Sequence, residues 1–137
     1  MNPMLPRSHQ IAQKAYNRVE ARQRFDAKKA YGVLAHKLPV LILQNGLAQA
    51  TGFLLAKAKD EHLALLDDLA QILRETGEPG CTDGKSMHHD TIIKADTAKT
   101  MHLTRRTLEA SGWIKRYVQG VLKVDATGGD DEVKGKS

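Results

Sequence analysis

Residues 37–50 read KLPVLILQNGLAQA, and the run continues as TGFLLAK to Lys57. Pro39 suits the first turn of a helix, because the N–H that proline lacks has no intrahelical partner there. From Val40 to Lys59 a helix would be apolar on nearly all sides, and a helix of that kind is buried. Small residues recur along it and let another backbone come close: Gly46, Ala48, Ala50 and Gly52. The stretch therefore predicts a buried core helix.

The rest of the chain also has helical periodicity. Four further helices are predicted: His9–His36 after an N-cap at Ser8, Glu61–Thr76 before Gly77, Asp90–Met101, and Thr104–Leu122. No segment alternates apolar and polar residues as a half-buried strand does. We therefore expect an all-α fold, a compact bundle of about five to six helices. Residues 1–124 form this single helical domain, and the acidic, glycine-rich residues 125–137 are expected to be a disordered tail.

Charge is unevenly distributed along the chain. Its 137 residues suffice for one domain and carry 21 Lys and Arg against 16 Asp and Glu, a net charge of +5. Arg7–Lys37 carries a net charge of +6 and Met101–Val124 carries +4, whereas Phe53–Gly80 carries −3. The helix in this last segment is expected to present an acidic outer face: Asp67, Asp68, Gln71 and Glu75. A basic chain of this kind favours a polyanionic partner.

Two sets of basic side chains are candidate contacts to a nucleic-acid backbone. They are Lys14, Arg18, Arg22 and Lys29 in the first predicted helix, and Arg105, Arg106, Lys115 and Arg116 in the last one. Residues four apart rise about 6 Å along a helix, close to the spacing of successive phosphates on a strand. The alternative interpretation is a solvated face whose long side chains cover apolar neighbours.

The sequence offers no catalytic constellation. Neither phosphate-binding pattern, GxxxxGK[ST] or GxGxxG, occurs in it. Cys81 is the one cysteine, and we expect it to be exposed in a glycine-rich loop without a base to activate it. His88 and His89 are adjacent and point in different directions, and Asp67-Asp68 is expected to be a solvated surface. We therefore expect no enzyme activity, no cofactor and no metal.

Composition also limits the kind of partner. Aromatic residues make up only 4% of the chain, and most occur where helix packing requires them. Contacts to a nucleic acid are therefore expected to go to phosphate and sugar rather than to stacked bases. No run of 18 or more apolar residues occurs, and the first residues lack the apolar region of a secretory signal. We expect a cytoplasmic protein that makes no contact with a membrane.

The opening stretch also resembles a known family. KLPVLILQNGLAQA followed by Phe53–Lys57 is similar to the small all-helical subunit of the type III-B CRISPR RNA-silencing complex, the Cmr complex. Three other places agree: Ala15-Tyr16 with Val19, Thr104 shortly before Leu108-Glu109-Ala110, and Trp113-Ile114-Lys115-Arg116. The resemblance covers most of the chain, from about Ile11 to Lys123.

The resemblance implies a non-catalytic subunit that stacks in several copies along the body of a ribonucleoprotein. In such a complex a guide RNA pairs with invading target RNA, and other subunits cut the target. The small subunit would line the groove beside the guide–target RNA duplex with basic side chains. The implied partners are other subunits of the Cmr complex, further copies of the chain itself and this RNA duplex, in antiviral defence.

Other functions remain open at this point. The first alternative is a free-standing helical DNA-binding protein whose last helix enters a major groove, with Arg105 and Arg106 near the start of that helix. Another is a structural adaptor whose positive charge only aids solubility. The acidic helix Glu61–Thr76 is also a candidate to meet the basic surface of a neighbouring copy, which would stack copies head-to-tail.

Overall fold

The computed structural model describes residues 5–128, and all regular elements within them are helical. In chain order they are α1 (Arg7–Glu20), α2 (Lys28–Asn45), α3 (Leu47–Lys57), α4 (Asp60–Glu75), α5 (Gly84–Ser86), the π-type turn η1 (Met87–Ile92), α6 (Thr97–Tyr117) and the π-type turn η2 (Val118–Leu122). The predicted all-α bundle of five to six helices is confirmed. No helix in the described part of the chain combines the length and the apolar character that crossing a bilayer requires.

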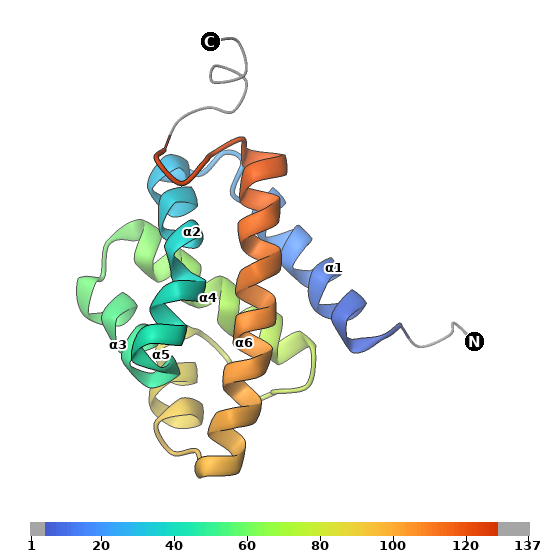
Figure 1. Ribbon diagram of the computed structural model, residues 1–137, viewed down its shortest axis with the longest axis vertical. Helices are drawn as coiled ribbons and strands as arrows, with labels where there is room; N and C mark the ends of the chain where they lie inside the picture. The colour runs from blue at the N-terminus through green and yellow to red at the C-terminus, as the bar shows by residue number, and fades with distance from the viewer. Residues whose placement is uncertain (1–4, 129–137) are drawn as a thin grey trace.

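The bundle is built along α6, the longest helix. In Figure 1 α6 runs along the long axis with α2 on one side and α1 on the other, and α4 packs against all three. Fully buried side chains from most helices meet between them: Ile11, Tyr31, Leu38, Ile42, Leu54, Leu65, Leu69, Leu73, Met87 and Leu103. The predicted helix Glu61–Thr76 is confirmed as α4, shifted by one residue at each end.

The last helix begins seven residues earlier than predicted. Asp96 is its N-cap, and the Asp96 carboxylate accepts a hydrogen bond of 2.8 Å from the Lys99 N–H. Thr104, where the predicted helix begins, lies inside α6, and its hydroxyl donates to the Thr100 carbonyl at 2.7 Å. The separate helix predicted for 90–101 is therefore wrong, because residues 90–92 belong to η1, residues 93–96 connect it to α6, and residues 97–101 belong to α6.

The first predicted helix, His9–His36, is interrupted. The chain leaves α1 after Glu20, turns through residues 21–27 and enters α2 at Lys28. A continuous helix of 28 residues would be about 42 Å long and could not keep its apolar side chains on one compact core. Phe25 fixes the turn, since its ring packs edge-on against Tyr31 with centroids 6.3 Å apart.

The opening stretch of the sequence analysis forms two helices rather than one. Pro39 lies inside α2 and not in its first turn. The break falls at Gly46, whose φ of 86° and ψ of 158° are almost exclusive to glycine. Burial is also one-sided: Leu38 and Ile42 are in the core, whereas Val40 is 52% exposed and Leu43 71% exposed.

The end of the described chain packs back on α2. The Val124 carbonyl lies 2.9 Å from Nε2 of His36, and the Val124 side chain is buried next to Gly32. Asp125, the first residue of the predicted tail, is also buried, and its carboxylate accepts hydrogen bonds from Thr127 N–H and Oγ1 at 2.9 and 2.7 Å. The rest of that predicted tail, residues 129–137, lies outside the described residues.

Candidate nucleic-acid interface

Two of the eight candidate basic residues, Arg18 and Arg22, are bound to a buried carboxylate. Asp68 of α4 is fully buried, and its Oδ1 accepts from Arg18 Nε at 2.9 Å and from Arg22 Nη2 at 2.7 Å. Its Oδ2 accepts from Arg22 Nε at 3.0 Å and from the Tyr31 hydroxyl at 2.6 Å. The expectation that Asp68 lies on an acidic outer face is therefore wrong, because α1 crosses α4 on that side.

This cluster is electrostatically self-consistent. The hydrogen bond to Asp68 raises the pKa of Arg22, so the guanidinium stays charged opposite the carboxylate. Burial, and then the charge of Asp68, hold the pKa of Tyr31 well above its usual value, so the hydroxyl keeps the proton that it donates. A buried carboxylate is tolerated only when such partners satisfy it. Arg18 and Arg22 are thus engaged in holding α1 and α2 to α4.

A third candidate, Arg106, is buried as well. Its side chain is 7% exposed, and its Nη2 donates to both the carbonyl and the hydroxyl of Thr76. Its Nη1 lies 3.5 Å from Glu78 Oε1, which also pairs with Lys99 Nζ at 2.6 Å. Because Arg106 ties α6 to the end of α4 and to the loop after it, its guanidinium is directed inward.

Other acidic side chains of α4 also have partners. Asp67 accepts a hydrogen bond of 2.8 Å from the Gly84 N–H, and Glu75 lies 3.9 Å from Nζ of the candidate Lys14. The acidic outer face predicted for this helix is therefore largely used within the molecule. Asp67 and Glu75 nevertheless stay exposed, so a head-to-tail contact through that face remains a prediction.

The remaining candidates lie on outer surfaces. Lys29, Arg105, Lys115 and Arg116 are exposed, and Lys14 is partly exposed. Within residues 5–128 no carboxylate lies within 4.0 Å of the charged side-chain nitrogens of the four exposed residues, Lys29, Arg105, Lys115 and Arg116. Arg105 and Arg116 are 11 residues apart, or three helical turns, and so share one face of α6 about 16 Å apart. Gly112 lies between them, and a Cβ there would meet nothing within 4 Å.

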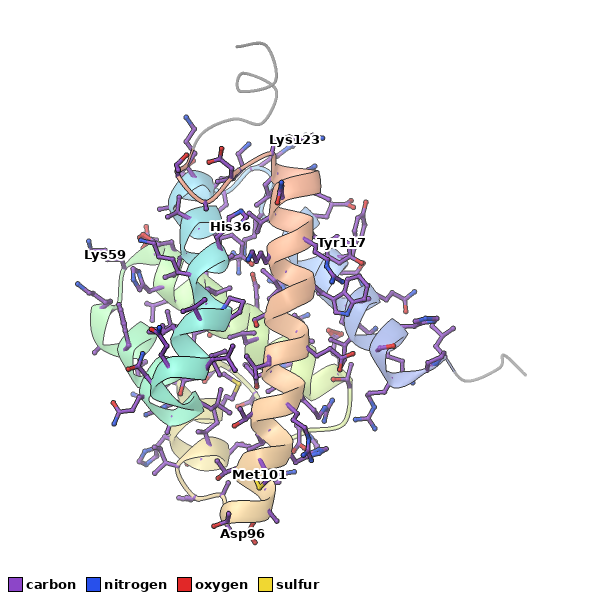
Figure 2. All side chains as sticks on the ribbon, in the orientation of Figure 1. His36, Lys59, Asp96, Met101, Tyr117 and Lys123 are labelled. Carbon is purple, nitrogen blue, oxygen red and sulfur yellow. The ribbon has the colours of Figure 1, made fainter. Side chains whose placement is uncertain are left out.

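An aromatic cluster that was not predicted from the sequence holds one of these arginines, Arg116. The Trp113 and Tyr117 rings stack at 5.7 Å, Tyr16 of α1 meets Tyr117 edge-on at 5.4 Å, and Tyr117 projects from α6 toward α1 (Figure 2). The Arg116 guanidinium lies 5.0 Å from the centre of the Trp113 ring. The i, i+3 and i+4 spacing of these residues in α6 was the available signal, because such residues are neighbours on a helix.

The cysteine and histidine side chains considered above as a nucleophile or as metal ligands have structural roles. Cys81 is fully buried instead of exposed, and burial raises the pKa of its thiol. His88 Nδ1 lies 2.7 Å from Thr51 Oγ1, and partial burial lowers the pKa of His88. The described part of the chain holds no group of three or more His, Cys, Asp or Glu side chains able to share a metal ion.

Comparisons with known proteins place the chain in a family. A family model described as CRISPR-associated protein (Cas_Cmr5) matches residues 7–121. The CRISPR system Cmr subunit Cmr5 of Thermus thermophilus is 36% identical over 120 residues, which are 88% of this chain and 99% of the relative. The X-ray crystal structure of a CRISPR-associated Cmr5 family protein from the same organism superposes with a TM-score of 0.78, at 36% identity over 87% of this chain and 99% of that chain.

Proposed function

Because the chain belongs to the Cas_Cmr5 family of CRISPR-associated proteins, we propose that it serves as a non-catalytic subunit of a Cmr-type effector ribonucleoprotein. In this role it packs against other subunits and further copies of itself along the guide–target RNA duplex. It holds the RNA backbone by charge, while base pairing between guide and target reads the sequence.

One observation supports the RNA contact above the others: the division of the basic side chains into inward and outward groups. Arg18, Arg22 and Arg106 hold helices together, whereas Arg105 and Arg116 face outward on α6 with Gly112 between them. Gly112 leaves room for a phosphate backbone to approach this face, which also carries the carboxylate of Glu109, so the two arginines supply the attraction there. Stacking on Trp113 orders the Arg116 guanidinium before binding, which lowers the entropy lost on contact. The proposed RNA contacts are therefore Lys14, Lys29, Arg105, Lys115 and Arg116.

The DNA-binding alternative receives no support from the helix boundaries. A recognition helix presents residues near its N-terminus to base edges. Since α6 begins at Thr97, Arg105 is the ninth residue of the helix and Arg106 is buried. The pair that suggested a recognition helix therefore lies in mid-helix, with one member turned inward.

RNA binding can be tested with a charge-matched pair of triple variants. We expect R105A/K115A/R116A to weaken binding to a duplex RNA, measured by fluorescence anisotropy across a salt series. The slope of log affinity against log salt is negative, and each lost phosphate contact should make it less steep by about 0.9. The control K59A/K85A/K94A removes the same charge from exposed positions on other segments and should keep the wild-type slope. Equal losses of RNA affinity in the two variants would mean that only net charge matters and not the position of the charges. In a separate assay, RNA cleavage by the purified chain with Mg²⁺ would disprove the non-catalytic role.

A further inference from the structure

An apolar groove lies on the surface of α2, in the part of the sequence that resembles the family most. The groove, about 410 Å³ in volume, runs along α2 past Leu34, Lys37, Leu41 and Gln44, and Phe53 of α3 contributes to its wall. These α2 positions span 10 residues, or about 15 Å of helix. We call it the α2 groove. Its length matches about three turns of a second helix lying along it.

Exposed aliphatic side chains border the α2 groove. Val40 is 52% exposed and lines it, and Leu43, one turn further along the same helix, is 71% exposed. Side chains of this kind have no group that can bind phosphate or sugar, so the surface does not suit an RNA backbone. Contiguous exposed apolar surface is typical of a protein interaction site.

No aspartate or glutamate is among the residues that line the α2 groove. From Ala27 to Lys59 the sequence contains five lysines and no aspartate or glutamate. Lys37 lines the groove, and Lys57 Nζ lies 5.8 Å from the centre of the Phe53 ring in its wall. A complementary surface therefore combines apolar residues with carboxylates beside them.

We propose that the α2 groove binds an amphipathic helix of another subunit, one whose apolar stripe is flanked by aspartate or glutamate. The identity of the partner as another subunit rests on the proposed function, whereas the chemistry of the groove does not. Such helices place apolar anchors at i, i+3 or i+4, and i+7. A second copy of this chain is a poor donor, because the leucine stripe of its acidic helix α4 is buried and Asp68 is paired inside.

The chemistry is tested first on the purified full chain with a synthetic helix. The probe carries leucines at i, i+3, i+4 and i+7 between glutamates, and its match carries lysines in place of the glutamates. We expect the glutamate probe to bind about tenfold more tightly than the lysine probe. Val40→Glu, at a side chain that lines the groove and is 52% exposed, should abolish this binding, whereas Ile93→Glu, at a side chain 53% exposed elsewhere, should leave it unchanged. Equal affinity for the two probes, or no effect of Val40→Glu, would overturn the proposal.

The partner is identified in the assembled complex. A photoreactive benzoylphenylalanine placed at Leu43 of a tagged chain should crosslink to another subunit, within a segment of helical apolar spacing flanked by acidic residues. Crosslinks to RNA or to another copy of the chain would disprove the proposed occupant. If the unmodified tagged chain does not assemble with a Cmr-type complex at all, the proposed function fails, and the probe measurements still decide the groove chemistry.

Discussion

Asp68 shows how one carboxylate determines the role of several other residues. It is fully buried and receives hydrogen bonds from Arg18 of α1, Arg22 of the turn after α1 and Tyr31 of α2. Removing a buried partner of this kind leaves the remaining charges poorly compensated. The two arginines therefore act as structural residues, although their four-residue spacing in the sequence is that of a phosphate-binding stripe.

Asp68→Ala should lower the free energy of unfolding by on the order of 3 kcal/mol, because two guanidinium groups and the buried Tyr31 hydroxyl lose their acceptor. Urea denaturation followed by circular dichroism measures the effect. Asp90→Ala is the matched control, since Asp90 is exposed and only 3.7 Å from Lys94, and it should change stability by less than about 0.5 kcal/mol. Similar values for the two variants would mean that Asp68 is not the link between α1 and α4.

His88 makes stability depend on pH. Burial, and then the neighbouring His89, lower the pKa of His88 below its ordinary 6.5, so the folded chain favours the neutral ring. The unfolded chain binds this proton more readily, and the stabilisation present above pH 6.5 is lost as the pH falls toward the folded pKa. His62, whose pKa burial also lowers, acts in the same direction.

We therefore expect the melting temperature to fall between pH 6.5 and pH 5, and to fall less in His88→Gln, which keeps a polar group near Thr51 without titrating in this range. Thermal melts of both proteins at a series of pH values provide the comparison. Parallel curves for the wild type and the variant would assign the pH dependence to other groups.

At the scale of elements, glycines decide where helices stop and how closely they pack. Gly46 separates α2 from α3 through a backbone conformation that side chains disfavour, although a Cβ there would meet nothing within 4 Å. Gly112 has equally open surroundings but helical backbone. A comparison of alanine substitutions at Gly46 and Gly112 therefore measures the cost of backbone strain without a contribution from steric clashes.

Gly46→Ala should cost about 1–3 kcal/mol of stability, because alanine must adopt a strained φ and ψ. Gly112→Ala should instead add about 0.5–1 kcal/mol, since alanine is the better helix former at an open position. Both values follow from chemical denaturation under the same conditions. A gain in stability for Gly46→Ala would show that α2 and α3 can join without the glycine break.

At the scale of the whole molecule, the end of the described chain closes the bundle. Val124 is buried against Gly32 of α2, where a Cβ would lie 2.5 Å from Val124 Cγ1, and both residues are far apart in sequence. Figure 1 shows the start of α2 and the end of η2 at the same end of the molecule. Gly32 is therefore required for close approach.

Val124→Ala should lower the free energy of unfolding by about 2 kcal/mol, from two lost methyl groups and the space that they leave. Val40→Ala makes the same chemical change at a half-exposed side chain and should stay within about 0.5 kcal/mol of the wild type. Thermal and urea denaturation of both variants test this closure, and a small loss at Val124 would contradict it.

The sequence by itself determined the helical class, the limits of α4 and the surplus of positive charge, because periodicity and composition are local properties. It misplaced the breaks at 21–27 and Gly46, since a helix of favourable periodicity ends where the core demands a turn. Only the tertiary structure decided which cations are free. Arg18 and Arg22 meet Asp68 across 50 and 46 residues, and an ion pair over that separation exists only once α1 lies across α4.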